Sequence, residues 1–322
     1  MDYKKLQNGS DIRGVALEGI EGQSVNLKEQ VCRDIGRGFA LWLIAKTGKT
    51  ADLRVAVGRD SRFSGPTLSN WICDAMRLAG LNVTDFGMAS TPAMFMSTVT
   101  NGYEFDGSVM ITASHLPFNR NGFKFFTAQG GLESADIKQI LAYAEGTQTT
   151  GLKPGSLCNG DFMDTYAQIL ADKIRSATGE DKPLAGFRIV VDAGNGAGGF
   201  YVDKVLKPLG ADTEGSRYLD PDGSFPNHIP NPENKEAMES ITEAVLESKA
   251  DLGIIFDTDV DRAGAVLSDG SELNRNRIIA MLAAILLREH PGTTIVTDSI
   301  TSTGLAKFIE EKGGVHHRFK RG

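Results

Sequence analysis

One recurring pattern, a short strand followed by an aspartate and then a helix, constrains the fold of this chain more than any other feature. Three β-rich runs lead within three residues to an aspartate and a polar turn: 53–57, 187–191 and 293–297. A helical spacing of apolar residues comes after the turn. Short strands that alternate with helices predict an α/β fold with mixed, mostly parallel sheets.

Three helices can be placed from their start signals. They are expected from Ser64 to Gly80, from Thr91-Pro92 onward, and from Asn231-Pro232 onward. Ser64 suits the N-cap of the first helix, and Leu78 is expected to complete its inward face. The inward face of the third is expected to carry Met238, Ile241 and Val245.

The length of 322 residues favours two or three domains. The stretch 146–160 contains four glycines, a proline and several threonines, and is interpreted as a linker. We therefore expect tandem α/β domains at 1–150, 151–268 and 269–322. About fifty residues is short for such a unit, so the third domain is expected to be incomplete.

Composition excludes several classes of protein. A net charge of −7 argues against a nucleic-acid-binding surface. The three cysteines show no zinc or disulfide spacing, which favours a reducing compartment. The longest apolar run, 278–287, is too short to span a bilayer and is interpreted as a buried helix. A soluble protein with no membrane partner is expected, in the cytoplasm or a plastid stroma.

The segment 112–117 places a hydroxyl and an imidazole side by side, Ser114 and His115, directly after an apolar run. Ligands of α/β proteins bind at loops that follow strands, which makes Ser114 a candidate nucleophile. Adjacent residues on a strand point to opposite faces, so His115 need not be the base that serves Ser114.

A second candidate site is the loop that follows the apolar strand 251–256. Asp257, Asp259 and Asp261 alternate along it, and Arg262 comes next. Alternate carboxylates on a tight loop can converge on one hard cation such as Mg²⁺. The alternative is a solvated acidic turn, although uncompensated carboxylates so close together repel one another. A serine, a cation site and nearby bases and cations together suggest phosphoryl transfer.

The glycine-rich segment 194–199 fits G-x-G-x-x-G and follows a strand, so a nucleotide-dependent oxidoreductase is one alternative. The other alternative is a close turn that needs glycine. Four cations near glycines or strand ends are either site residues or ordinary surface charges: Arg13, Arg59, Arg62 and Lys124.

Several separated segments occur in a fixed order: 11–14 (D-x-R-G), 58–62 (G-x-D-x-R), 112–117 with 121–124 (T-A-S-H-N-P and N-G-x-K, with one mismatch), 192–198 (D-x-G-N-G-A-G), 230–232 (P-N-P) and 257–262 (D-G-D-G/A-D-R, matched in its charged residues). In these segments the chain resembles the α-D-phosphohexomutases, which include phosphoglucomutases, phosphomannomutases and phosphoglucosamine mutases. The segments 10–14 and 89–95 look most like a divergent branch found in plants and algae.

The resemblance implies an intramolecular phosphotransferase that interconverts hexose 1-phosphate and 6-phosphate. It implies that Ser114 carries a phosphoryl group, passes it to the sugar phosphate to give a bisphosphate, and receives the other phosphate back. By the same resemblance, Mg²⁺ would be held by Ser114 and the three carboxylates, Asp257, Asp259 and Asp261. His115 and Lys124 would transfer protons, while Arg13, Lys124 and Arg262 would bind substrate.

The chain also departs from the family pattern. Leu116 stands where the family has Asn, and Thr258 and Val260 replace small residues. If position 258 requires a positive φ, threonine there costs about 1–2 kcal/mol. The family's third-domain sugar-reading segment and its fourth domain do not occur before Gly322. We therefore expect a C-terminally truncated chain that is a poor mutase when assayed alone.

The alternative function is a catalytically impaired sugar-phosphate-binding or regulatory homologue on the same scaffold. The identity of the hexose and the oligomeric state are left open by the sequence.

Overall fold

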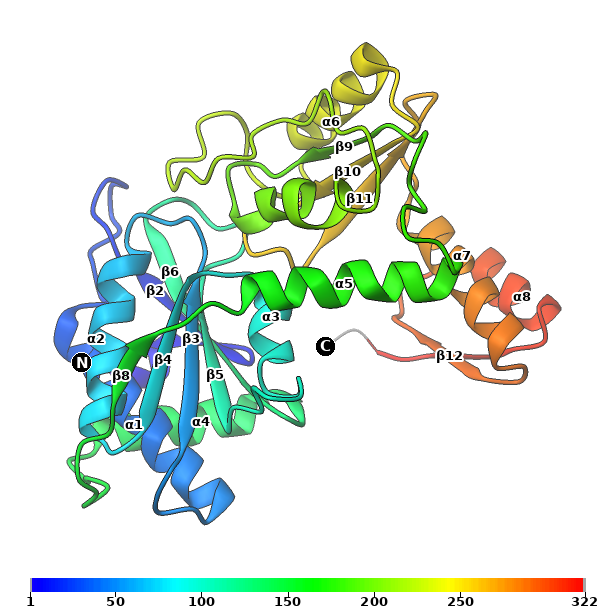
Figure 1. Cartoon of the computed structure of the whole chain (residues 1–322). Helices are drawn as coiled ribbons and strands as arrows, with labels where there is room; N and C mark the ends of the chain where they lie inside the picture. The colour runs from blue at the N-terminus through cyan, green and yellow to red at the C-terminus, as the bar shows by residue number, and fades with distance from the viewer. Residues whose placement is uncertain (1, 321–322) are drawn as a thin grey trace.

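The computed structural model describes residues 2–320. The first residue of the expected first domain, Met1, and the last two of the expected third domain, Arg321 and Gly322, lie outside the described residues. Figure 1 shows two sheets that lie one above the other and a smaller helical unit beside them. The mixed, mostly parallel α/β fold predicted from the strand–aspartate–helix pattern is confirmed. The domain boundaries at 150/151 and 268/269 remain predictions.

The first sheet has eight strands. In order across the sheet they are β1 (Gln7–Asn8), β2 (Asp11–Val15), β6 (Arg120–Thr127), β5 (Gly107–Ile111), β3 (Arg54–Arg59), β4 (Asn82–Met88) and β8 (Leu157–Asn159), with β7 (Gly130–Gly131) paired to β6. The strands β5, β3, β4 and β8 are parallel, whereas β6 is antiparallel to both β5 and β2. The stretch 146–160, predicted to be a linker, contains the edge strand β8. This strand forms there because its backbone pairs in parallel with β4.

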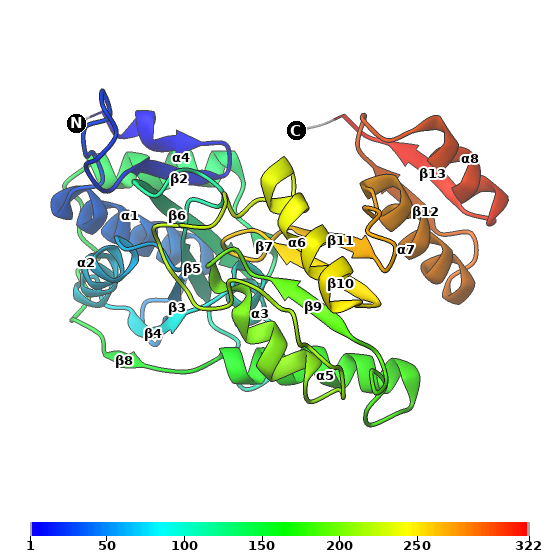
Figure 2. The ribbon, with the colours of Figure 1, turned by 90° about the horizontal axis from the view of Figure 1, so that it is seen from above.

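Helices cover both faces of this sheet (Figure 2). One core lies under α1 (Glu29–Thr47), α2 (Gly65–Leu78) and α4 (Ser134–Glu145), and the other under α3 (Thr91–Met96) and the start of α5 (Met163–Thr178). Successive residues of β5 alternate between the two cores, with Val109 in the first and Met110 in the second. A strand buried on both faces explains why 107–111 is apolar throughout.

The second sheet contains β9 (Ile189–Asp192), β10 (Leu252–Phe256) and β11 (Ala263–Leu267). The helix α6 (Lys235–Ser248) packs on one face through Ile241 and Val245. The other face meets the short helices η2 (Ala197–Gly199) and η3 (Val202–Leu206). The middle of α5 packs on η3 while its start packs on the first sheet, so α5 links the two units.

The remaining unit comprises α7 (Arg275–Glu289), β12 (Thr294–Thr297), α8 (Thr303–Glu311) and β13 (Val315–Arg318). Its two strands pair in parallel, as the third repeat of the sequence pattern predicts. The helix predicted at 278–287 is present within α7, but the prediction that it is buried is wrong for most of its residues. Four apolar residues of α7 are 41–51% exposed: Met281, Leu282, Ile285 and Leu286. The helix packs with α8 and β12 on one side only, which leaves this face open.

Three local predictions also need correction. Ser64 is the N-cap residue of α2, as expected, but its hydroxyl accepts a hydrogen bond from Asn121 and makes no capping hydrogen bond. Leu78 is half exposed at the last turn of α2. The helix expected at 231 begins at Lys235 with Asn234 as its N-cap, since 231–234 forms a turn. Among the described residues, no helix is long and apolar enough to cross a membrane.

Candidate active site

The two loops singled out by the sequence face one another across the seam between the first and second units. Ser114 follows β5, and Asp257 follows β10, 143 positions later. The Ser114 Oγ donates to Asp257 Oδ2 at 3.1 Å and accepts from Arg262 Nη2 at 2.8 Å. Carboxyl ends of strands from two different sheets therefore meet at one point, where a ligand would contact both.

Ser114 adopts a left-handed backbone conformation, with φ of +52°, and is 5% exposed. This conformation changes the expected geometry of its neighbour. The Nδ1 atom of His115 lies 3.4 Å from Ser114 Oγ, so the two side chains share one side. The assumption that they point to opposite faces holds for an extended strand and is wrong here.

The charge state of His115 follows from its partners. Arg262 Nη2 lies 2.6 Å from Nδ1 and can only donate, so Nδ1 accepts and the ring is neutral. Burial, together with the positive charges of Arg262 and Arg13, lowers the pKa of His115. His115 is therefore a neutral imidazole beside the serine hydroxyl.

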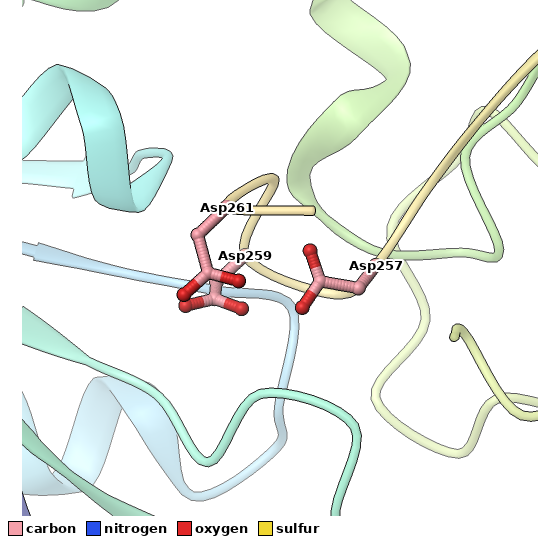
Figure 3. A group of neighbouring side chains, drawn as sticks. All are labelled: Asp257, Asp259 and Asp261. Atoms are coloured by element: carbon pink, nitrogen blue, oxygen red, sulfur yellow. The ribbon is translucent and has the colours of Figure 1, made fainter. Parts of the chain in front are cut away.

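The three carboxylates of the 257–262 loop converge, as Figure 3 shows. One oxygen from each of Asp257, Asp259 and Asp261 lies within 4.8 Å of the other two. Burial and the charges of Asp259 and Asp261 raise the pKa of Asp257. The Lys124 ammonium contacts Asp259 at 2.9 Å and Asp261 at 2.5 Å. Burial alone lowers the pKa of Lys124, but these two carboxylates outweigh burial and raise it, so Lys124 is cationic.

The donor set fits a hard divalent cation. Asp259 Oδ1 is buried and has no hydrogen-bond partner among the described residues. A buried carboxylate oxygen without a partner is costly, and three convergent carboxylates are the ligands that Mg²⁺ prefers. Asp257, Asp259 and Asp261 are thus the residues that could hold a metal, with the Ser114 hydroxyl beside them.

A cleft of about 480 Å³ opens in front of these groups. Its lining includes Arg13, Ser114, Lys124 and Arg262. The guanidinium of Arg13 donates to Asp11 Oδ2 at 2.8 Å and to the Ala113 carbonyl at 2.7 Å, which fixes its fork at the edge of the cleft. Five residues of the predicted site line this cleft: Arg13, Ser114, Lys124, Asp261 and Arg262. The other three contact lining residues from outside its wall: His115 meets Arg262, Asp257 meets Ser114, and Asp259 meets Lys124.

The most important group that the sequence left undecided is Arg62, which is 1% exposed. Its guanidinium donates to four backbone carbonyls of the loop that carries the serine, those of Ser114, Leu116, Pro117 and Arg120. Its Nε lies 3.3 Å from Asp60 Oδ2 as an ion pair, without the alignment of a hydrogen bond. Arg62 is therefore the internal support of the serine loop.

Two partners extend this support. Thr112 Oγ1 donates to Asp60 Oδ2 at 2.7 Å and accepts from the Ser114 amide at 2.9 Å, so Asp60 reaches the serine through one hydroxyl. The ring of Phe225, from the second unit, lies 5.1 Å from the Arg62 guanidinium. The G-x-D-x-R segment was the available signal for this pair, but nothing in it says which carbonyls the arginine meets.

The glycines of 194–199 are explained by close packing. A Cβ at Gly196 would lie 2.7 Å from the Thr258 carbonyl, and one at Gly199 would lie 2.2 Å from the Leu219 carbonyl. The segment leads into a helical stretch that runs from η2 to the end of η3 at Leu206, and its glycines pack against backbone atoms of Thr258 and Leu219. These glycines let the backbone approach the carboxylate loop.

Backbone strain in the carboxylate loop lies at Val260, with φ of +64°, and Thr258 is not among the residues with positive φ. The conditional cost assigned to Thr258 therefore does not arise. A β-branched residue in the left-handed region is a true outlier. Thr91, expected only as a helix start, holds this loop: its amide and its hydroxyl donate to the carbonyl and carboxylate of Asp259, at 2.8 and 2.5 Å.

Comparison with known proteins agrees with this geometry. The family models described as phosphoglucomutase/phosphomannomutase, alpha/beta/alpha domain I and domain II match residues 4–150 and 164–270. A phosphoglucomutase of Neisseria meningitidis serogroup B is 33% identical over 307 residues, which is 94% of this chain and 62% of that protein. A phosphomannomutase/phosphoglucomutase of Pseudomonas putida is 31% identical over 97% of this chain and 64% of its own length.

The same similarity extends to three dimensions. The crystal structure of a phosphoglucomutase/phosphomannomutase family protein from Burkholderia thailandensis has a TM-score of 0.87 and 31% identity, and the match covers 100% of this chain and 67% of that one. The chain thus spans less than two thirds of the length of these two curated relatives.

Proposed function

The chain belongs to the phosphoglucomutase/phosphomannomutase family, and from that premise we propose that it is a phosphohexomutase that works through a phosphoserine at Ser114. The substrate is a hexose monophosphate. The observation that carries the proposal is the meeting of Ser114 Oγ with Asp257 Oδ2 at 3.1 Å and Arg262 Nη2 at 2.8 Å.

The bonds balance in two transfers. In the first, the phosphoryl group leaves the Ser114 oxygen for a free hydroxyl of the sugar phosphate, which gives a hexose bisphosphate and a serine hydroxyl. In the second, after the sugar has turned over, its other phosphoryl group returns to Ser114. Such transfers depend on alignment and charge neutralisation more than on a strong nucleophile.

Proton movement is divided between two groups of unlike charge. The neutral ring of His115 can accept a proton, whereas the Lys124 ammonium can donate one. Arg262 now donates to both His115 and the Ser114 hydroxyl, and phosphate oxygens on Ser114 would compete for that donor. Arg13, at the edge of the cleft, supplies a planar fork for a substrate phosphate.

The metal proposed for the carboxylate loop is Mg²⁺, held by Asp257, Asp259, Asp261 and the oxygen of Ser114. When bound, it supplies positive charge that offsets the negative charge of the transferring phosphoryl group. The protein's own task is to keep three carboxylates convergent, with Asp257 and Asp259 buried away from water and Asp261 exposed toward the cleft.

The test is the transfer from a hexose bisphosphate to Ser114, the second of the two transfers, because it needs only residues described above. The protein is incubated with glucose 1,6-bisphosphate and Mg²⁺, and incorporated phosphate is located by intact-mass and peptide mass spectrometry. One phosphoryl group on Ser114 is expected. Ser114→Ala should incorporate none, whereas Ser176→Ala, a matched control at an exposed serine of α5, should behave like the parent.

Absence of incorporation under saturating bisphosphate would contradict the enzymatic proposal. Sugar-phosphate binding without incorporation would favour the alternative, an impaired binding or regulatory homologue, for which Leu116 is the main argument. A parent rate of incorporation in Ser114→Ala would contradict the assignment of the nucleophile.

A further inference from the structure

A buried histidine lies behind the cleft, between β9 and α6, and takes no part in the chemistry proposed above. His228 is 7% exposed. Its Nδ1 lies 3.0 Å from the Ile229 carbonyl oxygen, and its Nε2 lies 3.0 Å from both carboxylate oxygens of Asp192. Both ring nitrogens therefore face acceptors.

The surrounding donors decide how many protons the ring carries. A carbonyl oxygen can only accept, so Nδ1 must hold a proton. The two oxygens of Asp192 already accept from the Gly194 amide at 2.9 Å and from Ser240 Oγ at 2.7 Å. Asp192 is thus an acceptor on every side, and Nε2 must hold a proton as well. With Asp192 as a carboxylate, only the imidazolium form of His228 satisfies all of these contacts.

Charged and titratable groups from each neighbouring element agree with this form. Asp192 faces the ring from β9, and Glu236 of α6 adds a second negative charge. The Tyr218 ring packs against the imidazole at 5.4 Å, edge to face, from the segment before the turn. Burial lowers the pKa of His228, but the hydrogen bond and charge of Asp192 outweigh burial, so the pKa is raised.

The turn that begins at His228 leads directly to the reacting hydroxyl. Pro230 covers Gly194 so closely that a Cβ there would lie 2.8 Å from the proline ring. Asn231 Oδ1, one residue further, accepts from Arg262 Nη1 at 3.1 Å. The other terminal nitrogen of Arg262 donates to Ser114 Oγ. One end of this turn is thus fixed by the imidazolium, and the other end orients the guanidinium.

We propose that His228 is a positioning residue that acts as an imidazolium: with Asp192 it fixes the 228–231 turn, and through Asn231 it orients Arg262 toward Ser114. This role rests on the proposed function, since it assigns Arg262 to the phosphoryl group. Loss of the proton leaves one ring nitrogen facing an acceptor, which releases the turn. Phosphorylation of Ser114 therefore slows as the pH rises through the pKa of His228.

The sign of the pH effect follows from linkage. A histidine whose folded-state pKa is raised stabilises the fold fully below its unfolded value of about 6.5. That contribution disappears as the pH rises through the folded-state pKa. The contribution of His228 to the free energy of unfolding and the orientation of Arg262 toward Ser114 are therefore both lost as the pH rises above the folded-state pKa of His228.

The direct test is ¹⁵N NMR of the histidine rings in the full chain, with His228 assigned from backbone and side-chain connectivities in the parent protein. The expected result is two protonated nitrogens at neutral pH and a titration above pH 6.5. A neutral tautomer of His228 at or below pH 6.5 would overturn the proposal. This arm uses the parent protein, so it holds even if the variant fails to fold and even if Ser114 is never phosphorylated.

The functional arm is the pH profile of Ser114 phosphorylation by glucose 1,6-bisphosphate. In the parent, the rate should fall on the alkaline side. His228→Gln should be about tenfold slower at pH 7, with that limb absent and with little change in the bisphosphate concentration for half-maximal rate. His290→Gln, at an exposed histidine after α7, should keep the parent profile. A parent profile in His228→Gln would contradict the positioning role.

Discussion

The two loops that meet in the cleft are held in different ways. The serine loop, residues 112–120, is closed from inside: Arg62 satisfies four of its carbonyls, and Asp60 balances the Arg62 charge. In the carboxylate loop, residues 257–262, the Asp259 Oδ1 atom has no hydrogen-bond partner within residues 2–320. Each loop contains one residue in a left-handed conformation, Ser114 in the first and Val260 in the second. The first loop thus has a buried protein cation bound to its carbonyls, whereas the second retains negative charge and a carboxylate oxygen that a metal cation would satisfy.

The largest expected effect concerns the serine loop. Arg62→Met leaves Asp60 and four carbonyls buried without their donor, so the free energy of unfolding should fall by about 3–5 kcal/mol. Urea denaturation followed by tryptophan fluorescence measures this loss. Arg33→Met removes the ion pairs of a half-exposed arginine on α1, and it should cost less than about 1 kcal/mol. Equal losses of unfolding free energy in the two variants would contradict the claim that Arg62 is the internal support of the serine loop.

The next effect concerns the carboxylate loop. At a concentration one hundred times its Kd, Mg²⁺ should stabilise the parent by about 2.7 kcal/mol, because it binds the folded form alone. Thermal unfolding with increasing Mg²⁺ measures this gain. Asp259→Asn should abolish the gain, and Asp269→Asn, in an exposed turn, should preserve it. The same Mg²⁺ stabilisation in Asp259→Asn would show that the ion binds elsewhere.

A smaller effect is expected at Val260. Relief of its left-handed backbone is worth about 1–2 kcal/mol, from which the flexibility of glycine subtracts about 0.5–1 kcal/mol. Val260→Gly should therefore raise the free energy of unfolding by about 0.5 kcal/mol. Val99→Gly, at an exposed valine without positive φ, should lower it. Denaturant unfolding of both variants provides the measurement. A loss of equal size in the two variants would contradict the claim that the backbone of Val260 is strained.

The smallest effect is expected at Leu116. Arg62 binds its carbonyl oxygen, so the identity of its half-buried side chain matters little to the loop. Leu116→Asn should change the free energy of unfolding by less than about 0.5 kcal/mol. A loss as large as that of Arg62→Met would show that side-chain packing, and not the backbone, holds the serine loop.

The sequence predicted those features that local chemistry encodes. The strand, aspartate and helix pattern predicted the α/β fold, and alternate carboxylates predicted a convergent cluster. The position of Arg62 could not be predicted, because the value of a buried arginine depends on carbonyls from a loop more than fifty positions away. The same limit applies to Val260: the departure from glycine-like residues was visible at 258 and 260, but which one takes positive φ depends on how the loop closes against 194–199.

His228 illustrates a third kind of limit. The sequence around a single histidine near prolines gives no indication of whether the imidazole is protonated. Its imidazolium form follows only when Asp192 is seen to accept from Gly194 and Ser240 as well. To assign the protons of such a histidine, the hydrogen-bond partners of each ring and carboxylate atom must be known. Those partners come from β9, α6 and the segment between them.

The central claim, that Ser114 and the carboxylate loop share one cation, is tested most directly by anomalous scattering from crystals soaked in Mn²⁺ as a substitute for Mg²⁺. The account predicts one peak enclosed by Asp257, Asp259 and Asp261 and facing Ser114 Oγ. A well-soaked crystal with no peak there, or with manganese bound only at a site remote from Ser114, would contradict it.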